Sequence, residues 1–318
     1  MSKRNLNLDW SYQIANILAE KGIRHVCLCP GSRNTPLTIA FTNSEKFICT
    51  SHVDERSAAY FALGISKKEL TPSVLLSTSG TATANFFPAI IESSLSKVPL
   101  IVITADRPLH LINTGENQTI NQHNIYGEYT RCFYDLGLPK EKVDSMTNKI
   151  LSIYSHTLGC DKNPPGPSHI NVPFDEPIIH EIFGETSINT IEGEPHIFNS
   201  KELNLDTLDF EDSMIICGNN QQDELSEYII KFSEHINAPI LADPTSGLRY
   251  RLEHENIISN YNLFVDDLNI NPKTIIRFGS KPTSKSLCKL ISRHHNVTFI
   301  DRYSTFNDDS KNQIDVEP

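Results

Sequence analysis

The sequence has neither a surplus of basic residues nor a long apolar segment. Its 28 Lys and Arg residues are outnumbered by 39 Asp and Glu residues, which gives a net charge of -11, and there is no long basic run. A surface for nucleic acid or anionic lipid is therefore not expected. No segment approaches the ~18 consecutive apolar residues of a membrane-spanning helix, and residues 1–10 contain no apolar signal core. These absences predict a cytoplasmic protein without membrane insertion.

Three common binding motifs are also missing. The seven cysteines are scattered, and Cys27 and Cys29 have no second cysteine pair or His cluster with which to form a zinc site. Both lie in an apolar run, where a period of two places them on one strand face as reduced core thiols. The absence of a G-x-G-x-x-G fingerprint argues against a dinucleotide-binding Rossmann protein. No Gly-Asp pair occurs anywhere in the chain.

What is present indicates two α/β domains. The 318 residues are 38% hydrophobic and 21% charged, which is typical of a globular protein. Apolar strands alternate with helices in the first part, and this pattern predicts a parallel sheet covered on both faces. Strands are expected at 25–29, 46–52, 73–78, 99–104 and 166–173, and helices at 10–21, from about 35, at 54–68 and at 81–96. Residues 112–129 are predicted to form a long loop, which is often functional.

A second, smaller Rossmann-like domain is expected after a polar linker. The predicted boundaries are 1–183 for the first domain, 184–206 for the linker and 207–318 for the second domain. The second domain is expected to contain strands at 213–217, 239–242, 274–278 and 296–301, with helices at 222–235 and 283–293. Its polar tail, residues 307–318, is expected to fray.

Polar residues gather where the strands of the first domain end. Ligands of parallel sheets bind beyond these carboxyl ends. Each residue alone has a plain structural explanation: Glu55 as a carboxylate at a helix start, Arg33 and Arg107 as surface charges or ion-pair partners, and residues 79–81 as a helix cap. By themselves, the residues predict a polar cleft that tolerates anions and contains one carboxylate.

The motifs as a set resemble a known family. They are P-G-S-R-N-T-P at 30–36, D-E-R-S-A at 54–58, T-S-G-T at 78–81, T-A-D-R-P at 104–108 and N-V-P-F-D-E-P at 171–177. Together they resemble the pyrimidine-binding domain of thiamine-diphosphate enzymes. The S-R-N-T-P, D-E-R-S-A and T-A-D-R-P versions resemble the SEPHCHC synthase family in particular. The resemblance is dense over about 8–180 and weaker in the second domain, where 277–279 and 282–285 fit the family's central domain.

The resemblance implies thiamine diphosphate with Mg²⁺ as cofactor, and it implies roles for individual residues. Glu55 would be the catalytic carboxylate: it would hydrogen-bond the pyrimidine nitrogen and favour the imino tautomer, which takes the proton from the thiazolium C2. The other cofactor-binding residues would be Pro30, Gly31, Thr78, Ser79 and Gly80. The substrate-binding residues would be Ser32, Arg33, Arg107, Asn117, Gln118 and Lys285. The implied substrates are 2-oxoglutarate and isochorismate, whose carboxylates the two first-domain arginines would clamp.

The resemblance also implies parts that this chain does not supply. Family members hold the diphosphate and Mg²⁺ on a Gly-Asp-Gly … Asn motif in a third, C-terminal domain, so no metal site is expected in this chain. The site would form between subunits of a homodimer or homotetramer. We expect a segment of a longer enzyme that is inactive alone. Two alternatives stay open: another thiamine-diphosphate enzyme, such as an acetohydroxyacid synthase or a 2-oxoacid decarboxylase, and a non-catalytic stand-alone binding or regulatory module.

Overall fold

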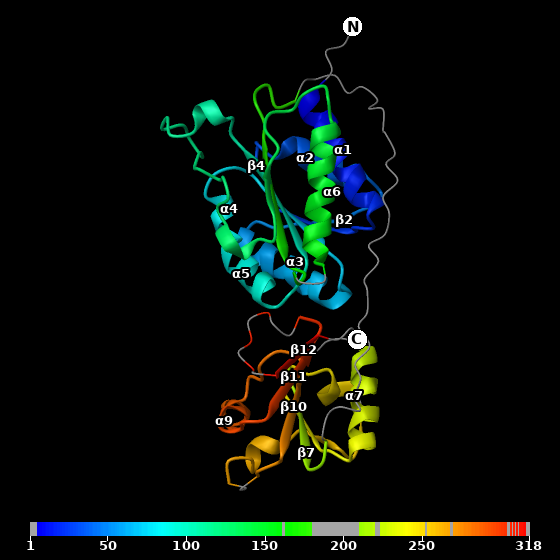
Figure 1. Cartoon of the computed structure of the whole chain (residues 1–318). Coiled ribbons are helices and arrows are strands. Elements are labelled where there is room, and N and C mark those ends of the chain that lie inside the picture. The colour runs from blue at the N-terminus through cyan, green and yellow to red at the C-terminus, as the bar shows by residue number, and fades with distance from the viewer. Residues whose placement is uncertain are drawn as a thin grey trace. The chain divides into compact units, whose positions relative to one another are not determined.

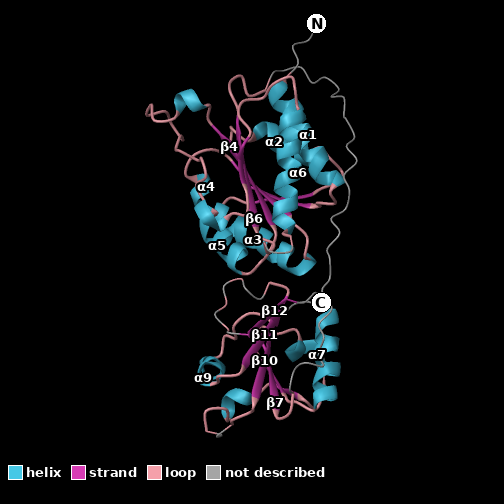
Figure 2. Ribbon diagram, viewed as in Figure 1, coloured by secondary structure: helices cyan, strands magenta, loops and turns pink. Residues whose placement is uncertain are grey.

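Two compact α/β units make up the described part of the chain in a computed structural model (Figures 1 and 2). The structure describes residues 5–160, 163–179, 210–219, 223–251, 253–267, 270–303, 306, 308, 310 and 312–315. The linker predicted at 184–206 lies outside these residues. Among the described helices, none combines the length and apolar character needed to cross a bilayer.

The first unit is built on a six-stranded sheet in which all paired strands are parallel. The strand order is β2-β1-β3-β4-β6-β5. The strands are β1 (His25–Leu28), β2 (Ile48–Ser51), β3 (Ser73–Ser77), β4 (Leu100–Asp106), β5 (Phe133–Asp135) and β6 (Pro167–Pro173). The three central strands β3, β4 and β6 are buried along their whole length. This agrees with the continuous apolar runs that predicted a doubly covered parallel sheet.

Helices cover both faces of this sheet (Figure 2). They are α1 (Leu6–Glu20), α2 (Thr35–Thr42), α3 (Glu55–Glu69), α4 (Ala82–Asn85), α5 (Phe87–Leu95) and α6 (Asp144–Leu158), with 3-10 turns η1 (Leu109–Leu111) and η2 (Gly127–Tyr129). Alternate strand residues divide between two core clusters. Val26 and Leu28 pack with α1, α2 and α6, whereas Cys27 and Cys29 pack with α3 and α5. The prediction that both cysteines share one strand face is confirmed, and both are free thiols.

The second unit has the strand order of a doubly wound Rossmann sheet. Its parallel strands run β12-β11-β10-β7-β8-β9, which is 6-5-4-1-2-3 when they are renumbered from the first strand of this unit. They are β7 (Ser213–Cys217), β8 (Ile240–Ala242), β9 (Ile257–Ile258), β10 (Thr274–Phe278), β11 (Val297–Asp301) and β12 (Asn312–Asp315). The helices are α7 (Asp223–Ile236), α8 (Leu248–Arg251) and α9 (Lys285–Arg293), with a 3-10 turn η4 (Tyr261–Leu263). The predicted Rossmann-like domain is confirmed.

A buried aspartate closes the carboxyl edge of this second sheet. Asp243 follows β8 and is 0% exposed. Its carboxylate accepts hydrogen bonds from the backbone N–H groups of Thr245, Thr283 and Ser284, at 3.0, 2.8 and 3.3 Å. These bonds and those from the Thr245 and Thr283 hydroxyls outweigh the effect of burial and lower the pKa of Asp243. The last of these three N–H groups belongs to the N-cap residue of α9.

Several element boundaries differ from the prediction. The first helix begins at Leu6 rather than at residue 10, because the Asn5 side chain caps it by accepting a hydrogen bond from the Leu8 N–H at 3.1 Å. The helix predicted at 81–96 is divided into α4 and α5, with Pro88 in the first turn of α5. Proline has no N–H to donate to the preceding turn, so the helix is interrupted there.

Several elements were not predicted, among them α8 and β9 of the second unit, and one prediction was wrong. Strand β5 and helix α6 lie in a stretch to which the sequence prediction assigned no element. Fraying of the tail is wrong for residues 312–315, because they pair in parallel with β11 as the edge strand β12. Its polar Asn-Gln-Ile-Asp sequence carries little apolar signal, and an edge strand needs little.

Candidate functional site

The candidate site lies where the strand order of the first sheet reverses. The chain leaves β1 toward β2 on one side and returns to β3 on the other, which is the position where open α/β sheets bind ligands. The turns after β1 and β3 touch there: a Cβ added to Gly31 would lie 2.4 Å from Cβ of Thr78. The Thr78 hydroxyl is buried and finds no hydrogen-bond partner among the described residues. These turns contain the five residues predicted to bind cofactor along with Glu55.

Glu55 is the first residue of α3, next to this reversal. Asp54 caps the helix by accepting from the Ser57 N–H at 2.9 Å, and this leaves the Glu55 side chain half-buried at the rim. Asn85 Nδ2 donates to Glu55 Oε2 at 3.2 Å. Burial, followed by the negative charges of Glu55 and Asp54, raises the pKa of the Cys29 thiol to about 12. The rim therefore presents a carboxylate at a helix N-terminus, where negative charge is favoured.

The predicted substrate loop is hydrogen-bonded directly to the predicted cofactor turn. Ser79 Oγ donates to the Gln118 carbonyl and Gln118 Nε2 donates to the Ser79 carbonyl, both at 3.1 Å. The Gly80 N–H donates to Gln122 Oε1 at 2.8 Å. Gly80 has a positive φ of 84°, and a Cβ there would lie 2.9 Å from Gln118 Cγ, so the turn requires glycine. Asn117 and Gln118 are thus held beside the turn that follows β3.

A buried polar network connects the loop that contains Asn117, Gln118 and Gln122 to the strands of the sheet. The amide of Asn171 uses its full hydrogen-bonding capacity: it accepts from Thr104 Oγ1 and Gln122 Nε2, and it donates to the carboxylates of Asp106 and Asp135, all within 2.8–3.0 Å. Gln122 also donates to the Ala105 carbonyl at 3.1 Å. The network therefore joins the ends of β4, β5 and β6 to the loop.

Two ionisable groups in this network have perturbed pKa values. Burial raises the pKa of the Asp106 carboxyl to about 6, against the opposing hydrogen bonds from Asn171 and from the Arg107 N–H. Burial, with His123 nearby, lowers the pKa of His169 to about 3. His169 Nε2 lies 2.8 Å from Thr104 Oγ1. The sequence contained a signal for this network, because polar residues alternate at 104 and 106 on β4 and at 169 and 171 on β6.

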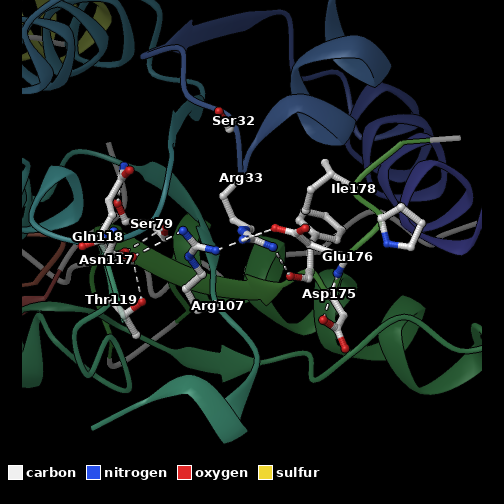
Figure 3. Close-up of polar contacts among 12 residues, drawn as sticks. Ser32, Arg33, Ser79, Arg107, Asn117, Gln118, Thr119, Asp175, Glu176 and Ile178 are labelled. Carbon is white, nitrogen blue, oxygen red and sulfur yellow. Dashed lines mark hydrogen bonds and ion pairs between the residues drawn. The ribbon is translucent and has the colours of Figure 1, made fainter. Parts of the chain in front are cut away.

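Arg33 and Arg107, from the turns after β1 and β4, converge on one carboxylate (Figure 3). Arg33 donates to the Phe174 carbonyl at 2.9 Å and to Glu176 Oε1 at 3.2 Å. An Arg107 NH1 atom lies 4.0 Å from the same Glu176 oxygen, and its NH2 donates to the Asn117 carbonyl at 3.3 Å. The geometry shows that both guanidinium groups can reach one anion. Glu176 belongs to a motif identified in the sequence, but no site role was predicted for it.

Within the first unit, the structure brings several of the predicted substrate residues together. Arg33, Arg107, Asn117 and Gln118 lie in one connected set of contacts, and Ser32 is exposed on the turn beside Arg33. Lys285 is an exposed residue in the first turn of α9, in the other unit. Within the described ranges, no three His, Cys, Asp or Glu side chains form a group that could hold a metal ion.

Comparison with known proteins agrees with the fold of the first unit. Residues 9–125 match the family described as thiamine pyrophosphate enzyme, N-terminal TPP binding domain. The first unit is thus a domain of the kind that forms the N-terminal part of thiamine pyrophosphate enzymes.

Within that class, the chain is similar to 2-succinyl-5-enolpyruvyl-6-hydroxy-3-cyclohexene-1-carboxylate (SEPHCHC) synthases. It is 35% identical to that of Chloroflexus aurantiacus over 301 residues, which cover 90% of this chain and 51% of the relative. It is 34% identical to that of Halobacterium salinarum over 322 residues, covering 92% and 55%. It is 37% identical to that of Bacillus pumilus over 300 residues, covering 88% and 51%. The chain spans about half the length of these relatives.

Proposed function

We propose that this chain forms the pyrimidine side of a SEPHCHC synthase. The complete enzyme would decarboxylate 2-oxoglutarate and add the succinyl unit to isochorismate, in the cytoplasm, as a step of menaquinone biosynthesis. The observation that carries the choice of substrates is the convergence of Arg33 and Arg107 on one carboxylate at the rim of a thiamine pyrophosphate domain. Both proposed substrates carry carboxylates, and arginine binds a carboxylate through two parallel hydrogen bonds.

The residues at the reversal of strand order fit the pyrimidine end of thiamine diphosphate. A half-buried carboxylate stands at the rim, and the buried Thr78 hydroxyl lies unpartnered under Gly31 in the described structure. When bound, the cofactor would supply a nucleophilic carbon that attacks the 2-oxo group. Glu55 would hold a proton at the pyrimidine ring nitrogen, and Asn85 would orient its carboxylate. The turn at 78–80 would approach the ring through its backbone.

The substrate side would use the two arginines and the loop beside them. Arg33 and Arg107 would bind substrate carboxylate oxygens, and Asn117 would fix the Arg107 guanidinium through its carbonyl. The hydrogen bonds between Ser79 and Gln118 would hold this loop at a constant distance from the cofactor turn. The role of Lys285 in substrate binding stays a prediction from the family resemblance. The same holds for a third domain that would carry Mg²⁺ and the diphosphate.

Apolar side chains next to Glu55 support the proposal that the complete enzyme is a homodimer or homotetramer. Val53 is 98% exposed, and Tyr60 and Phe61 on α3 are 46% and 47% exposed. A group of exposed apolar residues is typical of a surface that another protein covers. Because these residues flank Glu55 in the sequence, a second copy of the enzyme is the occupant that we propose to complete the site.

The test of the proposed function is a Glu55→Gln substitution in the full-length enzyme. Loss of the carboxylate should lower the rate of C2 proton exchange in bound thiamine diphosphate by roughly 10²- to 10⁴-fold, the usual contribution of general acid–base help. Proton NMR in D₂O measures this exchange. Glu69→Gln, at the opposite end of the same helix, is the matched control and should exchange normally.

Two results would count against the proposal. Undiminished exchange in Glu55→Gln would exclude the role of that carboxylate. Turnover of pyruvate in preference to 2-oxoglutarate would indicate a different thiamine-diphosphate enzyme.

A further inference from the structure

The guanidinium pair at the rim already holds an anion that belongs to the chain itself. Glu176 Oε1 lies 3.2 Å from a terminal nitrogen of Arg33 and 4.0 Å from one of Arg107. Arg33 comes from the turn after β1, and Arg107 from the end of β4. Glu176 reaches both from the segment that follows β6 (Figure 3). One side-chain carboxylate therefore stands where the proposed function needs a substrate carboxylate.

The burial of the three side chains is very unequal. The Arg33 side chain is 6% exposed and that of Arg107 is 18% exposed, whereas the Glu176 side chain is 71% exposed. Guanidinium groups largely withdrawn from water require a compensating anion. An exposed carboxylate, however, gains little from such a pair, because water and salt screen it. Glu176 thus compensates the charge of the two arginines, but the ion pairs that it forms are weak.

The contact with Arg107 also leaves hydrogen-bonding capacity unused. Arg107 Nε is buried and has no partner among the described residues. At 4.0 Å, Glu176 is beyond hydrogen-bond distance from this arginine. A carboxylate within hydrogen-bond distance of the terminal nitrogens of Arg107 would make a charge-assisted hydrogen bond, which is stronger than a contact at 4.0 Å. An incoming carboxylate can therefore make bonds with Arg107 that Glu176 does not make.

Displacement of Glu176 requires movement of one side chain only. Its backbone N–H donates to Asp175 Oδ1 at 2.8 Å, and the neighbouring Phe174 carbonyl stays bonded to Arg33 at 2.9 Å. The backbone can thus remain in place while the exposed Glu176 side chain turns into water. Arg33 would keep its orientation through the Phe174 carbonyl.

We infer that Glu176 is an affinity-determining residue of this site: its carboxylate occupies the Arg33–Arg107 pair in the ligand-free enzyme, and a substrate carboxylate takes its place. The inference rests on the proposed function, since it assigns the displacing anion to the isochorismate or 2-oxoglutarate of that reaction. When Glu176 occupies the two arginines, a substrate must displace it, so the affinity for substrate falls as the contact between Glu176 and the arginines becomes stronger. An exposed ion pair contributes at most ~1 kcal/mol, which corresponds to about a fivefold change in the dissociation constant of the substrate. A change of this size is measurable.

The experiment compares isochorismate binding to four forms of this 318-residue chain by calorimetric titration at low salt. Glu176→Gln should bind isochorismate about fivefold more tightly than the parent, because the competing charge is gone. Glu45→Gln removes the same charge from an exposed side chain just before β2, at the opposite edge of the sheet, and should bind like the parent. Arg107→Gln should bind more weakly than the parent.

The outcomes separate this inference from the proposed function. If Glu176→Gln binds no more tightly than the parent while Arg107→Gln binds more weakly, the substrate site stands and the competing role of Glu176 is refuted. If Arg107→Gln binds like the parent, the proposed carboxylate site itself is wrong. If neither the parent nor Glu176→Gln binds at millimolar isochorismate, the inference is overturned, and the activity of the full-length enzyme still decides the proposed function.

Discussion

Replacement of Asn171 by leucine should cost the first unit a large part of its stability. The amide makes four hydrogen bonds to side chains, and leucine has a similar size but makes none. Gln122 and Thr104 each keep another partner, on the Ala105 carbonyl and His169. The main loss falls on Asp106, which is 2% exposed: its Oδ2 loses the bond from Asn171, whereas its Oδ1 keeps the bond from the Arg107 N–H. A buried polar group left without a partner costs roughly 1–3 kcal/mol, and more if it is charged.

We therefore expect Asn171→Leu to lower the free energy of unfolding by about 3 kcal/mol at pH 8. The loss should be smaller at pH 5. The folded-state pKa of Asp106 is about 6, raised from 3.8, so this carboxyl is protonated at pH 5 and ionised at pH 8. The hydrogen bond from Asn171 favours the ionised form, and its removal would raise the folded-state pKa further. The variant is thus penalised most above pH 6.

Urea unfolding followed by tryptophan fluorescence measures this effect in the first unit alone. The chain has one tryptophan, and Trp10 is buried in α1 with its indole N–H donating to the Lys140 carbonyl at 2.7 Å. With a urea dependence of about 2 kcal/mol per molar, the midpoint should fall by roughly 1.5 M. Asn43→Leu removes an exposed amide at the end of α2 and should change stability by less than about 0.5 kcal/mol. If the two variants unfold at the same urea concentration, the network does not stabilise the unit.

Two further predictions concern charge and assembly. Asp106→Asn should cost more stability at pH 5 than at pH 8. With a folded-state pKa of about 6, the neutral carboxyl stabilises the parent at low pH, and this contribution is lost as the pH rises through 6. Equal losses in urea unfolding at both pH values would contradict the raised pKa. Phe61→Asp should weaken self-association of the full-length enzyme by at least tenfold in sedimentation equilibrium, since a desolvated charge at a protein interface costs more than ~1.4 kcal/mol. Tyr250→Asp, which alters an aromatic residue that is 73% exposed in the second unit, is the control, and unchanged assembly of Phe61→Asp would locate the interface elsewhere.

The regular elements of the fold were largely predictable from local patterns. Strands β7 and β10 have the predicted bounds because their apolar runs end abruptly at polar or glycine residues. Helix α3 begins one residue after its predicted start, where Asp54 is the cap rather than a helical residue. Helix α6 was missed, although Met146, Ile150 and Ile153 are buried at helical spacing. In all these cases, residues close together in the sequence determine the bounds of the helix or strand.

The polar network was not predictable in the same way. Its central contact, between Thr104 and Asn171, depends on the register of β4 against β6, two strands separated by 60 residues of sequence. The approach of Glu176 to Arg33 and Arg107 depends on the same pairing. The resemblance identified the motif that contains Glu176, but it gave no reason to expect this side chain on the guanidinium pair. Contacts of this kind require the three-dimensional arrangement.

The aspartate at the edge of the second sheet has a consequence for how that unit could evolve. The start of α9 and the loops beside it offer backbone N–H groups of the kind that can hold a phosphate. In this chain the carboxylate of Asp243 accepts hydrogen bonds from these N–H groups. A free anion would have to compete with a tethered one that never diffuses away. For this edge to bind a phosphate, Asp243 would therefore first have to be replaced.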